Sequence, residues 1–150
     1  MSKQSLAPLF SSKDMCWATP QKFFDDLNSE FHFTLDPCAD ESNHKCELFF
    51  TEEQDGLLQD WQGHTVFCNP PYGRDIKKWV KKCSDESQKP GTAVVMLIPA
   101  RTDTAYFHDF IYQKPDVEIR FLRGRLKFGD GKNSAPFPSM VVIFGRKPKQ

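Results

Sequence analysis

Thr65-Val66-Phe67-Cys68-Asn69-Pro70-Pro71-Tyr72 joins an apolar run to two prolines and an aromatic ring. The apolar run predicts a buried strand, and the two prolines hold Asn69 and Pro70 extended, with their carbonyls free for a ligand. In the segment that follows, 74–83, apolar side chains recur at helical spacing, at Ile76, Trp79, Val80 and Cys83. Strand, loop and helix in this order are typical of sites at the carboxyl ends of strands in open α/β sheets.

The loop after the apolar run has the groups needed to bind the exocyclic amino group of a nucleobase. Such a nitrogen is a poor nucleophile because its lone pair is delocalised into the ring. If the Asn69 side-chain oxygen and the Pro70 carbonyl each accept one N–H, the nitrogen is drawn toward tetrahedral geometry and its lone pair is aimed at an electrophile. Tyr72, beside Gly73 at the expected loop tip, is placed to stack on the base. A plain loop or a proline-rich ligand is the alternative interpretation.

The tetrapeptide resembles the Asp/Asn/Ser-Pro-Pro-Tyr/Phe motif of amino-methyltransferases, which act on adenine N6 or cytosine N4 with S-adenosylmethionine. The resemblance implies that Asn69, Pro70 and Tyr72 are the catalytic residues and hold the target base. Further segments, in the same chain order, look like the phage-type DNA N6-adenine methyltransferases, the Dam-like family, over residues 17 to about 145. They are Trp17-Ala18-Thr19-Pro20, Asp36-Pro37-Cys38-Ala39, Phe50-Thr51, Asp55-Gly56-Leu57, Trp61, Asn69-Pro70-Pro71-Tyr72, Pro99-Ala100-Arg101-Thr102 and Gly124-Arg125-Leu126-Lys127-Phe128.

The same resemblance implies a binding site for S-adenosylmethionine. Its amino-acid part would meet the Thr-Pro segment and the acidic strand end, and its adenine would meet Asp55. The implied cofactor residues are Thr19, Pro20, Asp36, Pro37, Cys38, Ala39, Asp55 and Asn69. Where the family has glycines after the first strand, this chain has Asp40-Glu41-Ser42. Glu52 and Glu53 are candidates for the carboxylate that binds the ribose, and solvated surface acids are the alternative.

Length and patterning predict one α/β domain over residues 17–150, preceded by a flexible arm over 1–16. Strands and helices alternate, which favours a mostly parallel, doubly wound Rossmann-like sheet; the last two strands, joined through 129–133, form an antiparallel hairpin. The expected strands cover 31–35, 46–50, 66–68, 93–98, 117–122 and 140–144, and the expected helices begin at Thr19-Pro20, with Thr19 as the cap, and cover 74–84 and 104–113. Only about thirty residues separate the first strand from the catalytic loop, so one strand-helix unit is shortened or lost.

Charge is divided unevenly along a chain whose formal net charge is zero. Residues 1–73 hold four Lys/Arg and twelve Asp/Glu, and residues 74–150 hold sixteen and eight, so the halves carry −8 and +8. An acidic half suits a cationic sulfonium cofactor, and a basic half suits DNA, unless folding interleaves the two. The predicted DNA-binding residues are Arg101, Arg123, Arg125 and Lys127, in a cluster that also includes Arg120, Lys132, Phe128 and Phe137. Core phenylalanines and solvated charges are the alternative.

Other features narrow the class of protein. No apolar stretch approaches the ~20 residues needed to span a bilayer, and residues 1–5 lack the apolar core of a signal peptide, so a cytoplasmic protein is expected, in the host cytoplasm if phage-encoded. The five cysteines form no CxxC pair, so no metal site is predicted. The oligomeric state is left open, with a monomer slightly favoured.

Three other functions are compatible with parts of the sequence. Pro37-Cys38 is similar to the nucleophile motif of C5-cytosine methyltransferases, although it follows the first strand and not the fourth. Methyltransferases that act on protein glutamine or on RNA bases share Asn-Pro-Pro-Tyr. A degenerate domain that binds DNA without a cofactor is the non-enzymatic alternative.

Overall fold

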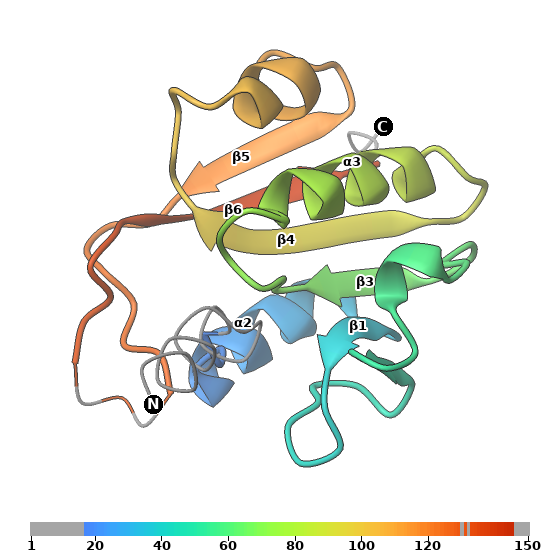
Figure 1. The fold of residues 1–150 in the computed structure, drawn as a ribbon, viewed down its shortest axis with the longest axis horizontal. Coiled ribbons are helices and arrows are strands. Elements are labelled where there is room, and N and C mark those ends of the chain that lie inside the picture. The colour runs from blue at the N-terminus through green and yellow to red at the C-terminus, as the bar shows by residue number, and fades with distance from the viewer. Residues whose placement is uncertain (1–16, 130, 132, 146–150) are drawn as a thin grey trace, which may run out of the picture.

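The computed structural model describes residues 17–129, 131 and 133–145, so the predicted arm 1–16 and Lys132 lie outside the described residues. The regular elements of this part of the chain include two α-helices and six strands (Figure 1). They are α2 (Gln21–Phe31), β1 (Asp36–Ala39), β2 (Phe49–Thr51), β3 (Thr65–Cys68), α3 (Ile76–Ser87), β4 (Ala93–Pro99), β5 (Val117–Phe121) and β6 (Ser139–Phe144). No helix in the described ranges is long and apolar enough to cross a bilayer.

The main sheet has four strands in the order β3-β4-β6-β5. β3 and β4 are parallel, whereas β6 runs antiparallel to both β4 and β5, which confirms the predicted C-terminal hairpin. The short parallel pair β1–β2 continues this sheet through a bridge between Leu35 and Val66. Between β1 and β3 the chain forms only β2 and a single 3₁₀ turn, Gly56–Leu58, as the short spacing predicts. The fold is therefore a compact α/β fold around a mixed sheet.

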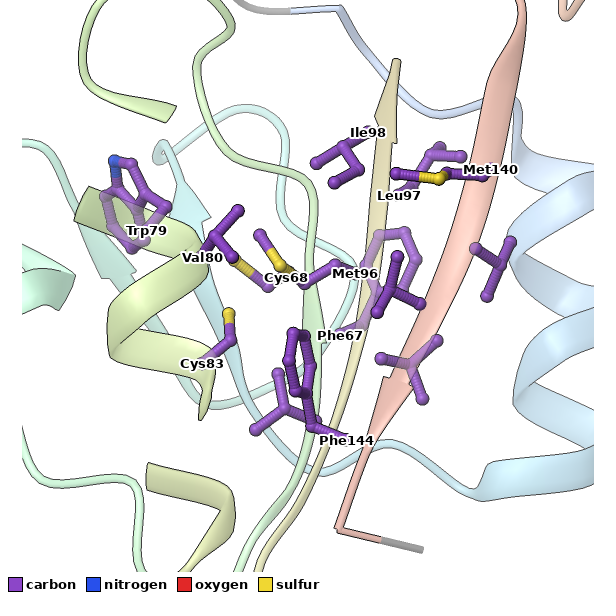
Figure 2. Close-up of a cluster of buried hydrophobic side chains, with 14 of the residues drawn as sticks. Phe67, Cys68, Trp79, Val80, Cys83, Met96, Leu97, Ile98, Met140 and Phe144 are labelled. Atoms are coloured by element: carbon purple, nitrogen blue, oxygen red, sulfur yellow. The ribbon is translucent and has the colours of Figure 1, made fainter. Parts of the chain in front are cut away.

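Helices cover both faces of the sheet, α3 on one and α2 on the other (Figure 1). Neighbouring residues of a strand point to opposite faces, so Phe67 meets Phe24 of α2, with ring centroids 5.1 Å apart, while Cys68 faces α3. Figure 2 shows Val80 and Cys83 of α3 directed at Cys68 of β3. β6 is buried along its whole length and β4 at every residue after its first. Each Val, Leu or Ile buried there contributes roughly 1.5–3 kcal/mol.

The predicted strand over 31–35 is wrong in its position. Phe31 ends α2, His32 turns the chain in a left-handed conformation with φ of 58°, and β1 begins only at Asp36. The alternation that suggested a strand has another cause, because Phe31 and Phe33 stack on each other at the helix end, 5.6 Å apart. The next strand, predicted over 46–50, lies at Phe49–Thr51.

Two predicted helix features are also corrected. The helix expected over 104–113 is a π-helical turn, Phe107–Ile111, closed by a 2.8 Å hydrogen bond from the Tyr112 N–H to the Phe107 carbonyl. It stops because Gln113 is left-handed, with φ of 57°, and a proline follows two residues later. Thr19 is not the cap of α2. The N-cap position belongs to Pro20, and no side chain caps this end of the helix.

The connection between β5 and β6 is long, and its described residues, 122–129, 131 and 133–138, are called the arm below. Figure 1 shows it leaving the sheet and running toward the start of α2. The Gly129 N–H donates to the Ala18 carbonyl at 3.0 Å, and the Trp17 ring contacts the edges of Phe128 and Phe137, at centroid distances of 5.7 and 5.2 Å. The arm thus fixes the segment that precedes α2, next to the carboxyl end of β3.

Candidate active site

Asn69 lies at the carboxyl end of β3, and the nitrogen and the oxygen of its side-chain amide have different surroundings. Its Nδ2 donates to the Trp17 carbonyl and, at 2.8 Å, to the Thr19 hydroxyl oxygen. A carbonyl can only accept, so the amide nitrogen must be the atom that faces Trp17. The Asn69 Oδ1 is buried and accepts no hydrogen bond from any residue that the structure describes. A buried acceptor without a donor costs roughly 1–3 kcal/mol, so this oxygen is available to a ligand that brings an N–H.

The sequence predicts Tyr72 at an exposed loop tip, but in the structure Tyr72 lies in the core. Its side chain is only 6% exposed, and its hydroxyl donates to the Leu97 carbonyl at 3.0 Å. The rings of Phe128 and Phe137 approach it edge-on, with centroids 6.4 and 5.6 Å away. Pro70 is buried beside it. The two prolines direct the aromatic ring beneath the arm, a contact between segments more than fifty residues apart that local sequence does not reveal.

A cavity of about 920 Å³ lies beside Asn69, within the usual size range of small-molecule sites. It is bounded by the segment before α2, by β1 and the loop after it, by the 3₁₀ turn and by the start of α3. Seven of the eight predicted cofactor residues line it, namely Thr19, Asp36, Pro37, Cys38, Ala39, Asp55 and Asn69. Pro20, the N-cap residue just before α2, does not line it. Glu52 lines the cavity and Glu53 does not.

The cavity wall is acidic. Six carboxylates and two lysines line it, which leaves four negative charges in excess; they are Asp36, Asp40, Glu41, Glu52, Asp55 and Asp75 against Lys45 and Lys78. Asp36 is the buried member, at 5% exposure, and its oxygens accept the backbone N–H groups of Lys45 at 2.9 Å and Cys38 at 3.3 Å. Burial raises the pKa of Asp36, and the two backbone hydrogen bonds oppose that rise. The arrangement favours a cation over an anion.

Gly56 is a functional position whose role the sequence motif alone did not explain. A Cβ at this residue would lie 2.3 Å from the Pro37 carbonyl oxygen and 3.1 Å from the Trp79 ring. Glycine is therefore required where the 3₁₀ turn meets β1 and α3. Trp79 itself was predicted only as part of the apolar face of a helix, yet it also forms part of the cavity wall.

Cys38 lines the same cavity, but its thiol is not set up as a nucleophile. Its Sγ lies 3.6 Å from the Sγ of Cys68, and burial raises the pKa of the Cys38 thiol well above its ordinary value. The thiolate is the reactive form of cysteine. This environment disfavours the C5-cytosine mechanism that Pro37-Cys38 suggested.

The four predicted DNA-binding residues are all exposed. Arg101 follows β4, and Arg123, Arg125 and Lys127 lie together on the arm. Arg120 differs, because its guanidinium forms two hydrogen bonds with Glu30, at 2.7 and 2.8 Å. Phe128 and Phe137 are buried, so the alternative interpretation of these two rings as core residues holds.

Comparison with known proteins identifies the family. The family model described as DNA N-6-adenine-methyltransferase (Dam) matches residues 8–148, a range that includes Asn69 and the whole cavity. The chain belongs to the Dam family. A DNA N-6-adenine-methyltransferase of Haemophilus phage HP1 is 32% identical over 144 residues, covering 91% of this chain and 82% of the relative. A DNA N-6-adenine-methyltransferase of Escherichia phage T1 is 35% identical over 94 residues, covering 61% of this chain and 38% of the relative.

Membership of the Dam family gives the geometry a chemical context. Transfer of a methyl group to an amino nitrogen is favoured by acceptors that orient its N–H groups beside a pocket for the methyl donor. In this Dam protein the unpartnered Asn69 Oδ1 belongs to a residue that also lines the acidic cavity.

Proposed function

We propose that the protein transfers the methyl group of S-adenosylmethionine to N6 of adenine in DNA, with Asn69 as the residue that polarises the target amino group. The observation that carries this proposal is the buried, unpartnered Oδ1 of Asn69 beside the cavity. Family membership and the two phage relatives support adenine in DNA as the substrate. The phage origin of those relatives supports a site of action in the cytoplasm of a bacterial host.

The residues present fit S-adenosylmethionine. The cavity has sufficient volume, its wall is acidic, and Asp36 is a buried carboxylate suited to the ammonium group, while Asp55 can accept an N–H from the adenine ring system. When bound, S-adenosylmethionine supplies a methyl group on a positively charged sulfur, which keeps the electron pair of the breaking S–C bond. Because the cavity wall reaches Asn69, the same residue would contact both the cofactor site and the target base.

Asn69 acts on the amino group by accepting a hydrogen bond from one of its two N–H groups. The Pro70 carbonyl accepts the other, and no hydrogen bond to that carbonyl is found within the described part of the chain. The nitrogen lone pair then forms the new N–C bond, and the extra proton leaves to solvent after the transfer. No side chain of low pKa is needed, because orientation and charge stabilisation do the catalysis.

Access of the base to the Tyr72 ring requires a movement of the arm. Phe128 and Phe137 cover Tyr72, so a flipped base does not reach its ring while the arm is in this position. Arg123, Arg125 and Lys127 are on the same arm and exposed. Contacts between these cations and DNA phosphates would both offset part of the few kcal/mol needed to flip the base and reposition the arm.

Side-by-side transfer of tritiated methyl groups to DNA, to RNA and to protein tests this function. We expect label in DNA, and nuclease digestion followed by mass spectrometry should identify it as N6-methyladenine. Label in RNA or protein alone would contradict the proposal, and no binding of S-adenosylmethionine by calorimetry would favour a degenerate DNA-binding domain. Cys38→Ser should retain activity, whereas its inactivity together with methylation at cytosine C5 would revive the covalent mechanism.

A further inference from the structure

The hydroxyl of Thr19 makes a contact that neither a helix cap nor a cofactor ligand requires. Thr19 directly precedes the position that begins α2, where threonine commonly caps a helix, yet no side chain caps this end. Its Oγ1 instead accepts a 2.8 Å hydrogen bond from the Asn69 Nδ2, across fifty residues of sequence. The side chain is 6% exposed, so this bond is shielded from water.

We propose that Thr19 is a positioning residue for Asn69, a role that rests on the proposed function and adds to it. The two hydrogens of the Asn69 amide are both committed, one to the Trp17 carbonyl and one to the Thr19 hydroxyl. Two fixed donors in the plane of the amide define the direction of Oδ1, the one amide atom left without a partner. The segment 17–19 therefore orients the acceptor before the base arrives.

The opposite orientation of the amide would be inactive. Rotation by 180° would place Oδ1 against the Trp17 carbonyl, two acceptors facing each other, and would present N–H groups to the target amino group. The Trp17 carbonyl selects between the two orientations of the amide, because a carbonyl can only accept a hydrogen bond, whereas the Thr19 hydroxyl can donate or accept one. The second bond, to Thr19, fixes the remaining rotation, and pre-oriented groups of this kind gain their effect by avoiding reorganisation during the reaction.

The segment that holds Asn69 is itself held by the arm. The Gly129 N–H donates to the Ala18 carbonyl. Phe128, just before Gly129, and Phe137, after it, both contact the Trp17 ring. Thr19 therefore belongs to a segment that contacts both the arm and Asn69. Its position explains how a residue far from β3 in the sequence contributes to the geometry of the reacting group.

Thr19→Val and Thr19→Ser are the matched pair that tests this role, since valine keeps the shape of threonine without the hydroxyl and serine keeps the hydroxyl. With saturating cofactor and DNA, we expect Thr19→Val to lower the single-turnover rate about tenfold, the effect of one neutral hydrogen bond, and Thr19→Ser to stay near wild type. Cofactor affinity, measured by calorimetry, should change less than about twofold in both variants. Weaker cofactor binding with an unchanged saturated rate would overturn the proposal.

A second readout does not depend on activity. In the ¹⁵N spectrum, the side-chain NH₂ of Asn69 should exchange slowly with water in wild type and Thr19→Ser, and faster in Thr19→Val. Identical exchange in all three proteins would overturn the proposal even if the variants differ in rate. A wild-type protein that transfers no methyl group to DNA would instead reject the proposed function, while equal rates for wild type and Thr19→Val would reject the positioning role alone.

Discussion

Asn69 uses its amide as both donor and acceptor, and this dual use makes aspartate a poor replacement. Asn69→Asp keeps an oxygen for the target base but has no N–H for the Trp17 carbonyl or the Thr19 hydroxyl oxygen. A carboxylate would also face a carbonyl in a buried setting. We expect at least about a tenfold loss in single-turnover rate, although related motifs accept Asp at this position. An Asn69→Asp protein with the wild-type rate would show that the contacts with 17–19 do not orient the acceptor.

Two substitutions at Tyr72 distinguish the role of its ring in stacking from the role of its hydroxyl. Tyr72→Phe should leave turnover near wild type, because stacking uses the ring, and should lower the free energy of unfolding by about 1 kcal/mol, because the bond to the Leu97 carbonyl is lost. Tyr72→Ala should lose about 1–3 kcal/mol of binding to the target base and, because the ring is buried against Phe128 and Phe137, about 3–5 kcal/mol of the free energy of unfolding. Denaturant unfolding and DNA titration measure the two effects. Equal inactivity of both variants would mean that the hydroxyl takes part in the chemistry.

At the scale of single elements, β1 places the carboxyl group of Asp36 in the cavity wall, where burial changes its pKa. The pKa of Asp36 is raised above 3.8 by burial, so the carboxylate gains its proton at a higher pH than an exposed aspartate does. We expect the affinity for S-adenosylmethionine to fall as the pH decreases through that pKa, because the neutral acid no longer attracts the ammonium group. Asp36→Ala should bind more than tenfold more weakly at neutral pH and lack this pH dependence in calorimetry. Unchanged affinity would make Asp36 a structural residue.

The arm is the second element with a testable role. Replacing Arg123, Arg125 and Lys127 with alanine should reduce the dependence of DNA affinity on salt, by about one unit of slope for each lost phosphate contact. The matched control removes the same charge from exposed lysines elsewhere, Lys22, Lys81 and Lys114. Fluorescence anisotropy over a range of salt concentrations compares the two triple variants. Equal slopes in both variants would place the DNA on another surface.

These elements also show what sequence reveals and what it does not. β3, β4 and β6 were predictable because each is a local apolar run, and β5 because apolar and charged residues alternate along it. Asn69 was predictable because it follows an apolar run and precedes two prolines. The burial of Tyr72 and the pairing of Arg120 with Glu30 were not, because each depends on a segment distant in the sequence. The requirement for Gly56 likewise arises where three elements meet.

At the scale of the whole molecule, the fold keeps the acidic and the basic side chains apart, and Asn69 lies between the two groups. The acidic wall of the cavity comes almost entirely from the N-terminal half, and the exposed cations of the arm come from the C-terminal half, so the uneven distribution of charge along the sequence is kept in the structure. Asn69 lies between them, lining the cavity and bonded to the segment that the arm fixes. This placement suits a reaction between a cationic methyl donor and a base of a polyanion.

The single-turnover rate of methyl transfer to DNA, compared between wild type and Asn69→Ala at saturating cofactor and DNA, tests the role of Asn69 most directly. Circular dichroism and the two binding affinities, measured on the same samples, should show an intact fold and affinities within about twofold of wild type. We expect the rate to fall by ~10²–10³, the usual effect of removing one electrostatic partner of the transition state. A rate equal to that of wild type would contradict this role and would reduce Asn69-Pro70-Pro71-Tyr72 to a structural turn.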